Sequence, residues 1–242
     1  MNSPFENLSG MEYPGRILGV GRDASGLFDI LIYAITGRSP SSQARRLELE
    51  SDAIWTKPTD PQALRKGKVD LLIYPAVIFK NGLAASNGKQ TTDIAEASGL
   101  SPIQVLDQGM KKWDYEPDAP TFTPRIGGCI LPAGRAGLSL LKRAENGACL
   151  RYFYEVPLIP GKGSFVATYA GDNKDPLPPF TGEPKDLGLG EPTARAMAEG
   201  IYDSLRPPGR ALDFRVAVAC IFADPSDINN RQVFIINRQE RK

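Results

Sequence analysis

Three charged groups and two threonine hydroxyls lie close together in residues 115–126, Tyr-Glu-Pro-Asp-Ala-Pro-Thr-Phe-Thr-Pro-Arg-Ile. The prolines fix their own φ and favour an extended residue before them, so this loop holds its polar groups in place. Arg125 precedes residues 126–131, which are typical of a buried strand, and a guanidinium entering a core needs an anionic partner. Glu116, Asp118 or a ligand can supply it. An internal Arg–carboxylate pair that only ties down the loop is the competing interpretation.

A second polar loop, residues 37–43, follows an aliphatic run at 28–35 that predicts a strand. Arg38 offers planar, bidentate donors, and the hydroxyl of Ser39 and nearby backbone N–H groups suit the remaining oxygens of a phosphate. The Gly-Lys-Ser/Thr ending of a P-loop is missing. The loop therefore predicts an anion cradle, with an ordinary Ser/Pro turn as the alternative.

A third loop, residues 86–94, contains Asn87-Gly88 and precedes a short helix expected to start near Thr91 or Thr92. The N-terminal end of that helix favours a nearby negative charge. A plain turn followed by a capped helix explains the same pattern.

The order of these loops resembles the PurO-type IMP cyclohydrolase family, in its longer, bacterial-like branch. The resemblance covers nearly the whole chain and rests on these motifs: Tyr13-Pro-Gly-Arg16, Gly37-Arg38-Ser39, Asn87-Gly88 with Gln90-Thr91 and Asp93-Ile94, residues 116–126, 138–143, 151–155, 161–165 with Thr168-Tyr169, and 176–185. It implies closure of 5-formamidoimidazole-4-carboxamide ribonucleotide to IMP with loss of water, the last step of purine synthesis. It implies a purine nucleotide as partner and neither cofactor nor metal.

The same resemblance implies an α+β fold, a four-layer αββα sandwich resembling the N-terminal-nucleophile hydrolases. Those enzymes use a self-cleaved terminal nucleophile, and the start Met1-Asn-Ser-Pro-Phe5 offers no such residue. An amidohydrolase of this fold would require a processed terminus. A nucleotide-binding protein that has lost the chemistry is the other alternative.

No histidine occurs among the 242 residues, which excludes Ser-His-Asp and Cys-His catalysis and histidine-ligated zinc. Cys129, Cys149 and Cys220 are far apart and lie in apolar runs, so we expect buried, unreactive thiols. Proton transfer then falls to carboxylates, Lys, Tyr or water.

Ring closure requires a group that stabilises charge on the formyl oxygen and another that transfers protons. We expect Arg125 or Lys142 to meet that oxygen and Glu116 or Asp118 to transfer the protons. The expected substrate-binding residues are Arg16, Arg38 and Ser39 for the phosphate, and Tyr33, Tyr74, Asn87, Thr123 and Tyr169 for the ribose or base. Packing within a strand is an equal explanation for Tyr33 and Tyr74, and a solvated strand end competes for Lys142.

Composition predicts a single domain over residues 1–242, because no low-complexity linker divides the chain. A formal net charge of +1 argues against nucleic-acid binding. No apolar run is long enough for a membrane span and no signal-peptide pattern opens the chain, so we expect a cytoplasmic protein. The long loops leave room for a homo-oligomer.

Apolar patterning predicts a sheet-rich fold with two clear helices, at 101–113 and 192–205. The expected strands are 17–21, 28–36, 70–79, 126–131, 137–143, 149–156, 163–169, 213–222 and 231–237. The Pro-rich segment 171–186 is expected to be a lid over the nucleotide with Phe180 and Glu183 facing inward, or an oligomer contact, and its length argues against a plain surface loop.

Overall fold

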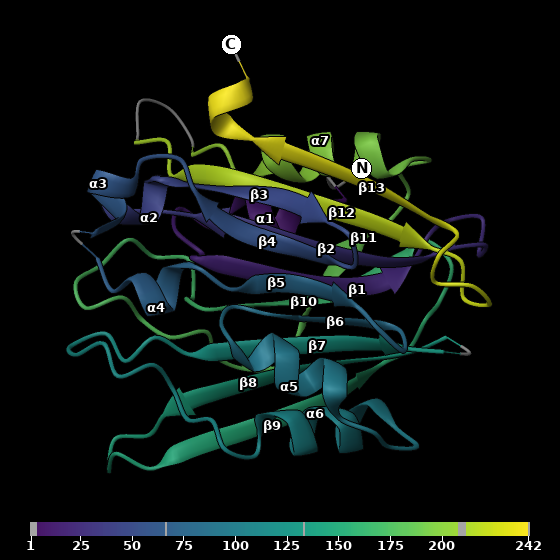
Figure 1. The fold of residues 1–242 in the computed structure, drawn as a ribbon, viewed down its shortest axis with the longest axis horizontal. Helices are drawn as coiled ribbons and strands as arrows, with labels where there is room; N and C mark the ends of the chain where they lie inside the picture. Colours follow the sequence, from purple (N-terminus) through teal and green to yellow (C-terminus); the bar gives the residue numbers. More distant parts are fainter. Residues whose placement is uncertain (1–3, 66, 133, 208–211, 242) are drawn as a thin grey trace.

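Two antiparallel sheets make up most of the protein in a computed structural model, which describes residues 4–65, 67–132, 134–207 and 212–241. The first sheet has the strand order β11 (Lys185–Gly188), β10 (Lys162–Ala167), β1 (Arg16–Arg22), β2 (Asp29–Thr36), β12 (Arg215–Ala223) and β13 (Arg231–Asn237). The second has the order β3 (Arg45–Glu50), β4 (Ala53–Pro58), β5 (Pro75–Phe79), β6 (Leu83–Ser86), β7 (Arg125–Leu131), β8 (Arg135–Arg143) and β9 (Cys149–Val156) (Figure 1). The structure thus confirms a mixed α/β protein built on sheets.

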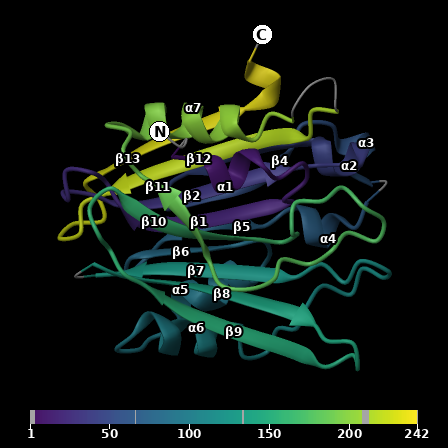
Figure 2. The ribbon, with the colours of Figure 1, turned by 180° about the vertical axis from the view of Figure 1, so that it is seen from behind.

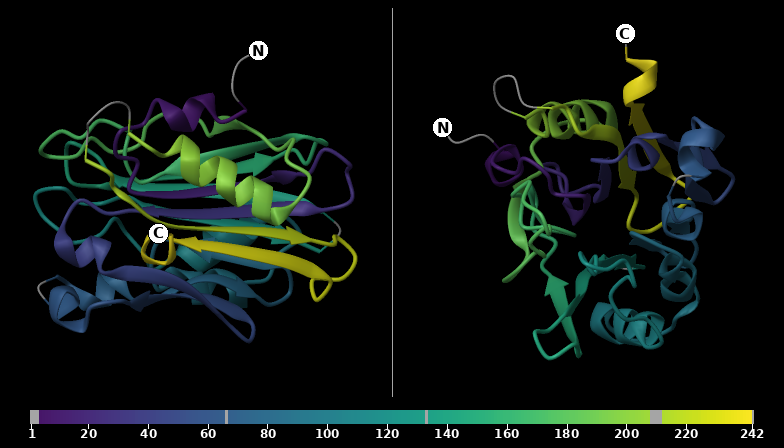
Figure 3. Two further views of the ribbon diagram at one scale, coloured as in Figure 1. Left: turned by 90° about the horizontal axis from the view of Figure 1, so that it is seen from above. Right: turned by 90° about the vertical axis from the view of Figure 1, so that its left-hand side faces the viewer.

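The two longest helices pack on different sheets. α7 (Ala194–Ser204) lies against β12 and β13, whereas α5 (Gln90–Glu96) and α6 (Pro102–Met110) lie against the second sheet. α5 and α6 are in front in Figure 1 and α7 is in front in the reverse view of Figure 2, so they cover opposite sides of the molecule. Figure 3 shows α7 running along β13. The remaining helices are short: α1 (Glu6–Ser9), α2 (Pro40–Gln43), α3 (Pro61–Arg65), α4 (Val69–Leu72) and the 3-10 turn η1 (Arg238–Glu240).

Capping explains where the two expected helices begin. The Ser101 side chain accepts a hydrogen bond from the Gln104 backbone N–H, and Pro102 fits the first turn, where no N–H is needed. The Thr193 side chain accepts from the Ala196 N–H in the same way. Both helices are therefore confirmed, with ends a few residues inside the expected ranges.

The prediction of a strand at 70–79 was wrong for its first residues. Residues 69–72 form helix α4, and β5 begins only at Pro75. Only Leu72 of α4 is buried, whereas residues 75–77 of β5 are all buried, so the apolar run divides between one helical turn and a strand. Four strands that we did not expect, β3, β4, β6 and β11, complete the sheets. In β3 charged residues alternate with Leu47 and Leu49, so a period of two was present without a continuous apolar run.

A pair of glycines in β7 brings three layers close together. A Cβ on Gly128 would lie 2.8 Å from Leu18 Cδ2 in the first sheet. A Cβ on Gly127 would lie 3.0 Å from Ile94 Cδ1 in α5 on the other side. Larger residues would push the layers apart. This close packing fixes the start of β7, where Arg125 lies, relative to the start of β1, where Arg16 lies.

No helix in the described ranges is long and apolar enough to cross a membrane. Cys129 and Cys220 are buried, and burial raises the pKa of the Cys129 thiol to about 12, as expected for unreactive thiols. Cys149 is instead partly exposed, because it lies at the start of the edge strand β9.

Candidate active site

A cavity of about 320 Å³ lies where β1 begins and β2 ends. Eleven of its lining residues carry polar or charged side chains, and the full lining is Tyr13, Arg16, Arg38, Ser39, Ser41, Ser42, Gly67, Lys68, Leu71, Leu72, Glu116, Asp118, Thr123, Tyr169 and Leu177. Seven of the residues expected from the sequence therefore meet in one cavity: Arg16, Arg38, Ser39, Glu116, Asp118, Thr123 and Tyr169.

Glu116 is the buried acid of this cavity. Its side chain is 2% exposed, and Oε1 lies 3.9 Å from Arg16 Nη2 and 4.0 Å from Arg125 Nη1. Asn87 Nδ2 donates a hydrogen bond to the same oxygen at 3.2 Å. Burial raises the pKa of the Glu116 carboxyl to about 7, and Arg16 and Arg125 only partly oppose that rise. This carboxyl is therefore able both to give and to accept a proton near neutral pH.

Hydrogen bonds within the loop of residues 115–126 hold Glu116 in place. The Glu116 N–H donates to the Thr123 carbonyl at 2.8 Å, and Asp118 accepts from both the N–H and the hydroxyl of Thr123, at 2.7 and 2.5 Å. Since the single hydroxyl proton of Thr123 goes to Asp118, the Tyr169 hydroxyl, 2.7 Å from Thr123 Oγ1, is the donor of that pair. Both oxygens of Asp118 are thus engaged in the loop.

Arg125 is anchored mainly by neutral groups. Its Nε donates to the Asp114 carbonyl at 2.8 Å and its Nη1 to Gln90 Oε1 at 3.0 Å, and the guanidinium stacks 4.8 Å from the centre of the Trp113 ring. The distance to Glu116 exceeds that of a hydrogen bond. The pair is a loose one, and Arg125 does not line the cavity.

Asn87 is fully used inside the protein. Its Oδ1 accepts from Gln90 Nε2 at 3.0 Å and from the Ile126 N–H at 2.8 Å, while its Nδ2 donates to Glu116 and to the Pro124 carbonyl. The geometry makes Asn87 a residue that positions Glu116. It leaves no side-chain atom over for a ligand.

Tyr33 and Tyr74 join β2 to the start of β5 beneath the cavity. Their hydroxyls lie 2.8 Å apart, and both side chains are at most 1% exposed. Burial raises the pKa of the Tyr33 hydroxyl well above its ordinary value. Neither residue lines the cavity, so packing beneath it describes their position better than contact with a ligand.

Arg45, a residue that the sequence analysis missed, is a buried cation beside this group. Its Nε donates to the Ser42 carbonyl at 3.0 Å, but neither of its terminal nitrogens has a hydrogen-bond partner among the described residues. Burial and the neighbouring charge of Arg16 lower the pKa of Arg45. The alternation in β3 was the available signal, since it places Arg45 on the buried face with Leu47.

Arg38 and its neighbours form the rim. Arg38 Nη1 donates to the Lys174 carbonyl at 3.1 Å, and its Nη2 lies 3.9 Å from Asp175, which ties the segment 171–186 to the mouth of the cavity. Ser39 caps α2 by accepting from the Ser42 N–H at 3.1 Å. Lys68 adds a further exposed cation, whose Nζ donates to the Pro117 carbonyl at 3.0 Å.

Neither of the two side chains expected to face inward from segment 171–186 lines the cavity. Phe180 is 1% exposed but packs in the hydrophobic core, and Glu183 is exposed, because it lies in the solvated turn before β11. Lys142, on β8, lies 3.5 Å from the Phe180 carbonyl and 5.5 Å from the Tyr152 ring centre. Burial lowers the pKa of Lys142, but this residue does not line the cavity with Glu116.

Gly15 supports Arg16 from a backbone position that other residues rarely adopt. It has a φ of +76°, and a Cβ there would lie 2.1 Å from Thr168 Oγ1, the atom that accepts the Arg16 N–H. We expect Gly15→Ala to lower the free energy of unfolding by about 2 kcal/mol, through backbone strain plus overpacking. Gly182→Ala is the matched control: its φ is +83° and no atom of the described residues lies within 4 Å of a Cβ there, so we expect a loss of about 1 kcal/mol. Equal losses in urea unfolding would contradict the packing argument.

The fold and this cavity together define a two-sheet α/β protein whose cationic cavity holds one carboxyl group that titrates near pH 7. The family model for IMP cyclohydrolase-like proteins matches residues 13–225. The chain therefore belongs to the IMP cyclohydrolase-like protein family. The match begins at Tyr13, a lining residue, and includes every loop of the cavity. A search of curated proteins finds no match.

Proposed function

We propose that this protein is an IMP cyclohydrolase that closes 5-formamidoimidazole-4-carboxamide ribonucleotide to IMP in purine biosynthesis. Family membership supports the substrate class. The observation that carries the proposal is Glu116, a carboxyl with a pKa raised to about 7 inside a cavity rich in cations. A phosphorylated substrate supplies the negative charge that such a cavity needs.

Glu116 can serve both proton transfers of the ring closure. The carboxamide nitrogen attacks the formyl carbon, a C–N bond forms, and the electron pair of the formyl C=O moves to oxygen. The attacking nitrogen loses one proton and the formyl oxygen gains one. The carbinol C–O bond then breaks, the formamido nitrogen loses its proton, and the oxygen departs as water. A carboxyl with a pKa near the working pH is suited to both roles. Asp118 is the weaker candidate, because Thr123 occupies both of its oxygens.

We assign oxyanion stabilisation to Arg16. It lines the cavity, lies 3.9 Å from Glu116 and has a buried Nε without a hydrogen-bond partner among the described residues. A fixed cation aimed at the developing charge costs no reorganisation during the reaction. Arg125 then acts on Glu116 only through its charge, from 4.0 Å, and Lys142 has no role in our scheme.

The phosphate belongs at the rim in this proposal, with Arg38, Ser39 and Lys68. We assign the contact with the ribose to Thr123 and Tyr169. Because the reaction is intramolecular, holding the two reacting arms coplanar supplies much of the rate enhancement. The scheme requires no terminal nucleophile. The helices on opposite sides of the two sheets support the four-layer αββα arrangement that we propose for the family fold.

Ultraviolet absorbance tests the proposed activity directly. The purified protein is mixed with the formamido ribonucleotide, and IMP formation is followed against the slow uncatalysed cyclisation. We expect saturable acceleration without added metal. No acceleration together with measurable IMP binding would refute the enzyme and favour a nucleotide-binding protein.

Replacing Arg38 by Ala tests the rim. We expect the Kd for IMP to rise by roughly 10- to 150-fold, about 1.5–3 kcal/mol, which is the scale of a charge-assisted hydrogen bond. Calorimetric titration with IMP measures this change. Arg195→Ala is the control, since it removes an exposed arginine on α7 that pairs with Glu199. An unchanged Kd for Arg38→Ala would remove the rim from the phosphate site.

A further inference from the structure

A second cavity, of about 250 Å³, lies at the opposite end of the sheets. β2 ends beside the candidate active site at Thr36 and begins at this second cavity with Asp29. Seven residue steps along an extended strand separate the two ends by roughly 23 Å. The turn between β5 and β6, the start of the turn after β7 and the turn after β12 close the cavity. It shares no lining residue with the candidate active site.

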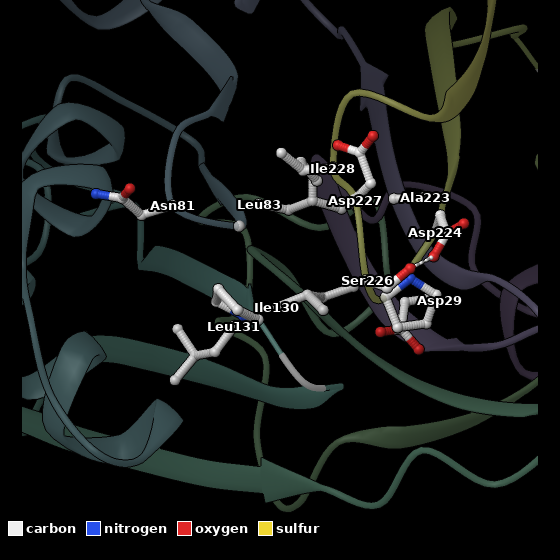
Figure 4. A pocket seen from close by; sticks show the side chains of 13 residues that line it. Asp29, Asn81, Leu83, Ile130, Leu131, Ala223, Asp224, Ser226, Asp227 and Ile228 are labelled. Atoms are coloured by element: carbon white, nitrogen blue, oxygen red, sulfur yellow. Dashed lines mark hydrogen bonds between the residues drawn. The ribbon is translucent and has the colours of Figure 1, made fainter.

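The lining combines an apolar wall with an acidic side. Figure 4 shows Asp29, Asp224 and Asp227 on one side of the cavity and Leu83, Ile130 and Leu131 on the other. Ala223, Pro225 and Ile228, at the end of β12 and in the turn after it, add further apolar surface. The 13 lining residues include no Lys or Arg. Such a lining favours a ligand with positive charge and a hydrocarbon body.

Asp29 carries an unused hydrogen-bond acceptor at this site. It is 1% exposed, and its Oδ1 accepts from both Nε and Nη2 of Arg22, at 2.9 and 2.8 Å. Its Oδ2 is buried and has no partner in the described part of the chain. A buried carboxylate oxygen without a donor is costly, so the site is incomplete as it stands. Burial raises the pKa of Asp29 even though Arg22 opposes the rise, which agrees with an acceptor that lacks a donor.

The two other aspartates shape the mouth of the cavity. Asp224 accepts from the N–H and hydroxyl of Ser226 and from Asn230, and Asp227 accepts from the Asn229 N–H. These hydrogen bonds hold the loop after β12 in shape, and the carboxylates add negative potential at the mouth of the cavity. No group of three or more Cys, Asp or Glu side chains within the described residues is arranged to hold a metal ion. An organic cation therefore fits this cavity better than a metal does.

We propose that this second cavity binds a small organic cation, an ammonium or amidinium group on an apolar body. The cationic head donates a hydrogen bond to Asp29 Oδ2, and the body packs on Leu83, Ile130 and Ile228. The rim aspartates attract the ligand without contacting it. The proposal is independent of the activity assigned to the first cavity.

Calorimetric titration with benzamidine and with its neutral isostere benzamide tests the charge requirement. We expect one benzamidine per chain, at least tenfold tighter than benzamide. The same comparison between pentylamine and pentanol separates the charge from the aromatic ring. Equal affinities within each pair, or no binding of either cation, would overturn the proposal.

Two substitutions locate the binding. Asp29→Asn is expected to weaken benzamidine binding at least tenfold. Because Asp29 also holds Arg22, Ile228→Trp provides an independent test: Ile228 is only partly buried, and a larger side chain there fills the cavity from the loop without entering the core. We expect it to abolish binding. Ile103→Trp makes the same change at a partly exposed position on α6 and should leave binding unchanged. Full binding by the Ile228→Trp protein would place the ligand elsewhere and refute the site.

Discussion

Replacing Glu116 by Gln is expected to lower kcat for IMP formation by roughly 10²- to 10⁴-fold, the usual contribution of general acid–base catalysis. Gln keeps an oxygen for the 3.2 Å hydrogen bond from Asn87 and fills nearly the same volume, but it cannot transfer a proton. Because Gln preserves this hydrogen bond and the packing around position 116, we expect the Kd for IMP to change less than kcat. Initial rates by ultraviolet absorbance and calorimetric titration with IMP measure the two quantities separately.

Glu145→Gln is the matched control for this substitution, since it makes the same chemical change at an exposed residue after β8. Its kcat should equal that of the unchanged protein. A Glu116→Gln protein with full turnover would show that Glu116 does not transfer the protons. Asp118→Asn would then be the next variant to measure.

The second large effect is the change in the free energy of unfolding with pH that Glu116 causes. Glu116 has a pKa of about 7 in the folded protein, compared with 4.5 for an unperturbed glutamate. The folded state therefore keeps a proton that the unfolded chain has already lost between these values. Its contribution to stability is fully present below pH 4.5 and is lost as the pH rises through about 7. The difference between the two pKa values corresponds to about 3 kcal/mol in the free energy of unfolding.

Urea unfolding of the unchanged protein and of Glu116→Gln, at pH values from about 4.5 to about 8.5, measures this effect. The range includes both pKa values of Glu116, 4.5 and about 7. The free energy of unfolding of the unchanged protein, relative to the Gln variant, should fall by about 3 kcal/mol across the range. Glu145→Gln reports what loss of an exposed charge does by itself. A pH-independent difference between the first two proteins would mean that burial does not favour protonated Glu116.

Local patterns in the sequence predicted much of the cavity and the sheet-rich fold. The same cavity contains residues of three loops that the sequence singled out: residues 115–126 with Glu116 and Asp118, the Arg38-Ser39 loop, and the Arg16 motif. The helix caps at Ser101 and Thr193 lie where local chemistry favours them. These features depend on residues close together in the chain, where backbone restrictions and side-chain-to-backbone hydrogen bonds act directly.

Other features needed contacts between distant segments. Nothing local shows that Glu116 rather than Asp118 is the proton-transfer group, because Glu116 is distinguished by its burial beside Arg16 of the distant strand β1. The same applies to Lys142. It shares a strand-end position with Arg125 in the sequence pattern, yet it lies beside Phe180 instead of in the cavity.

The residue types and local patterns of the chain were enough to exclude histidine chemistry, to indicate the family, and to identify the stiff loops and their charged residues. Three features depend on the tertiary structure: which carboxyl titrates near pH 7, the burial of Arg45 with no partner for its terminal nitrogens among the described residues, and the position of Asp29 at a second cavity. Desolvation and charge pairing depend on what surrounds a group in three dimensions. Strands distant in sequence, packed closely at Gly127 and Gly128, supply those surroundings.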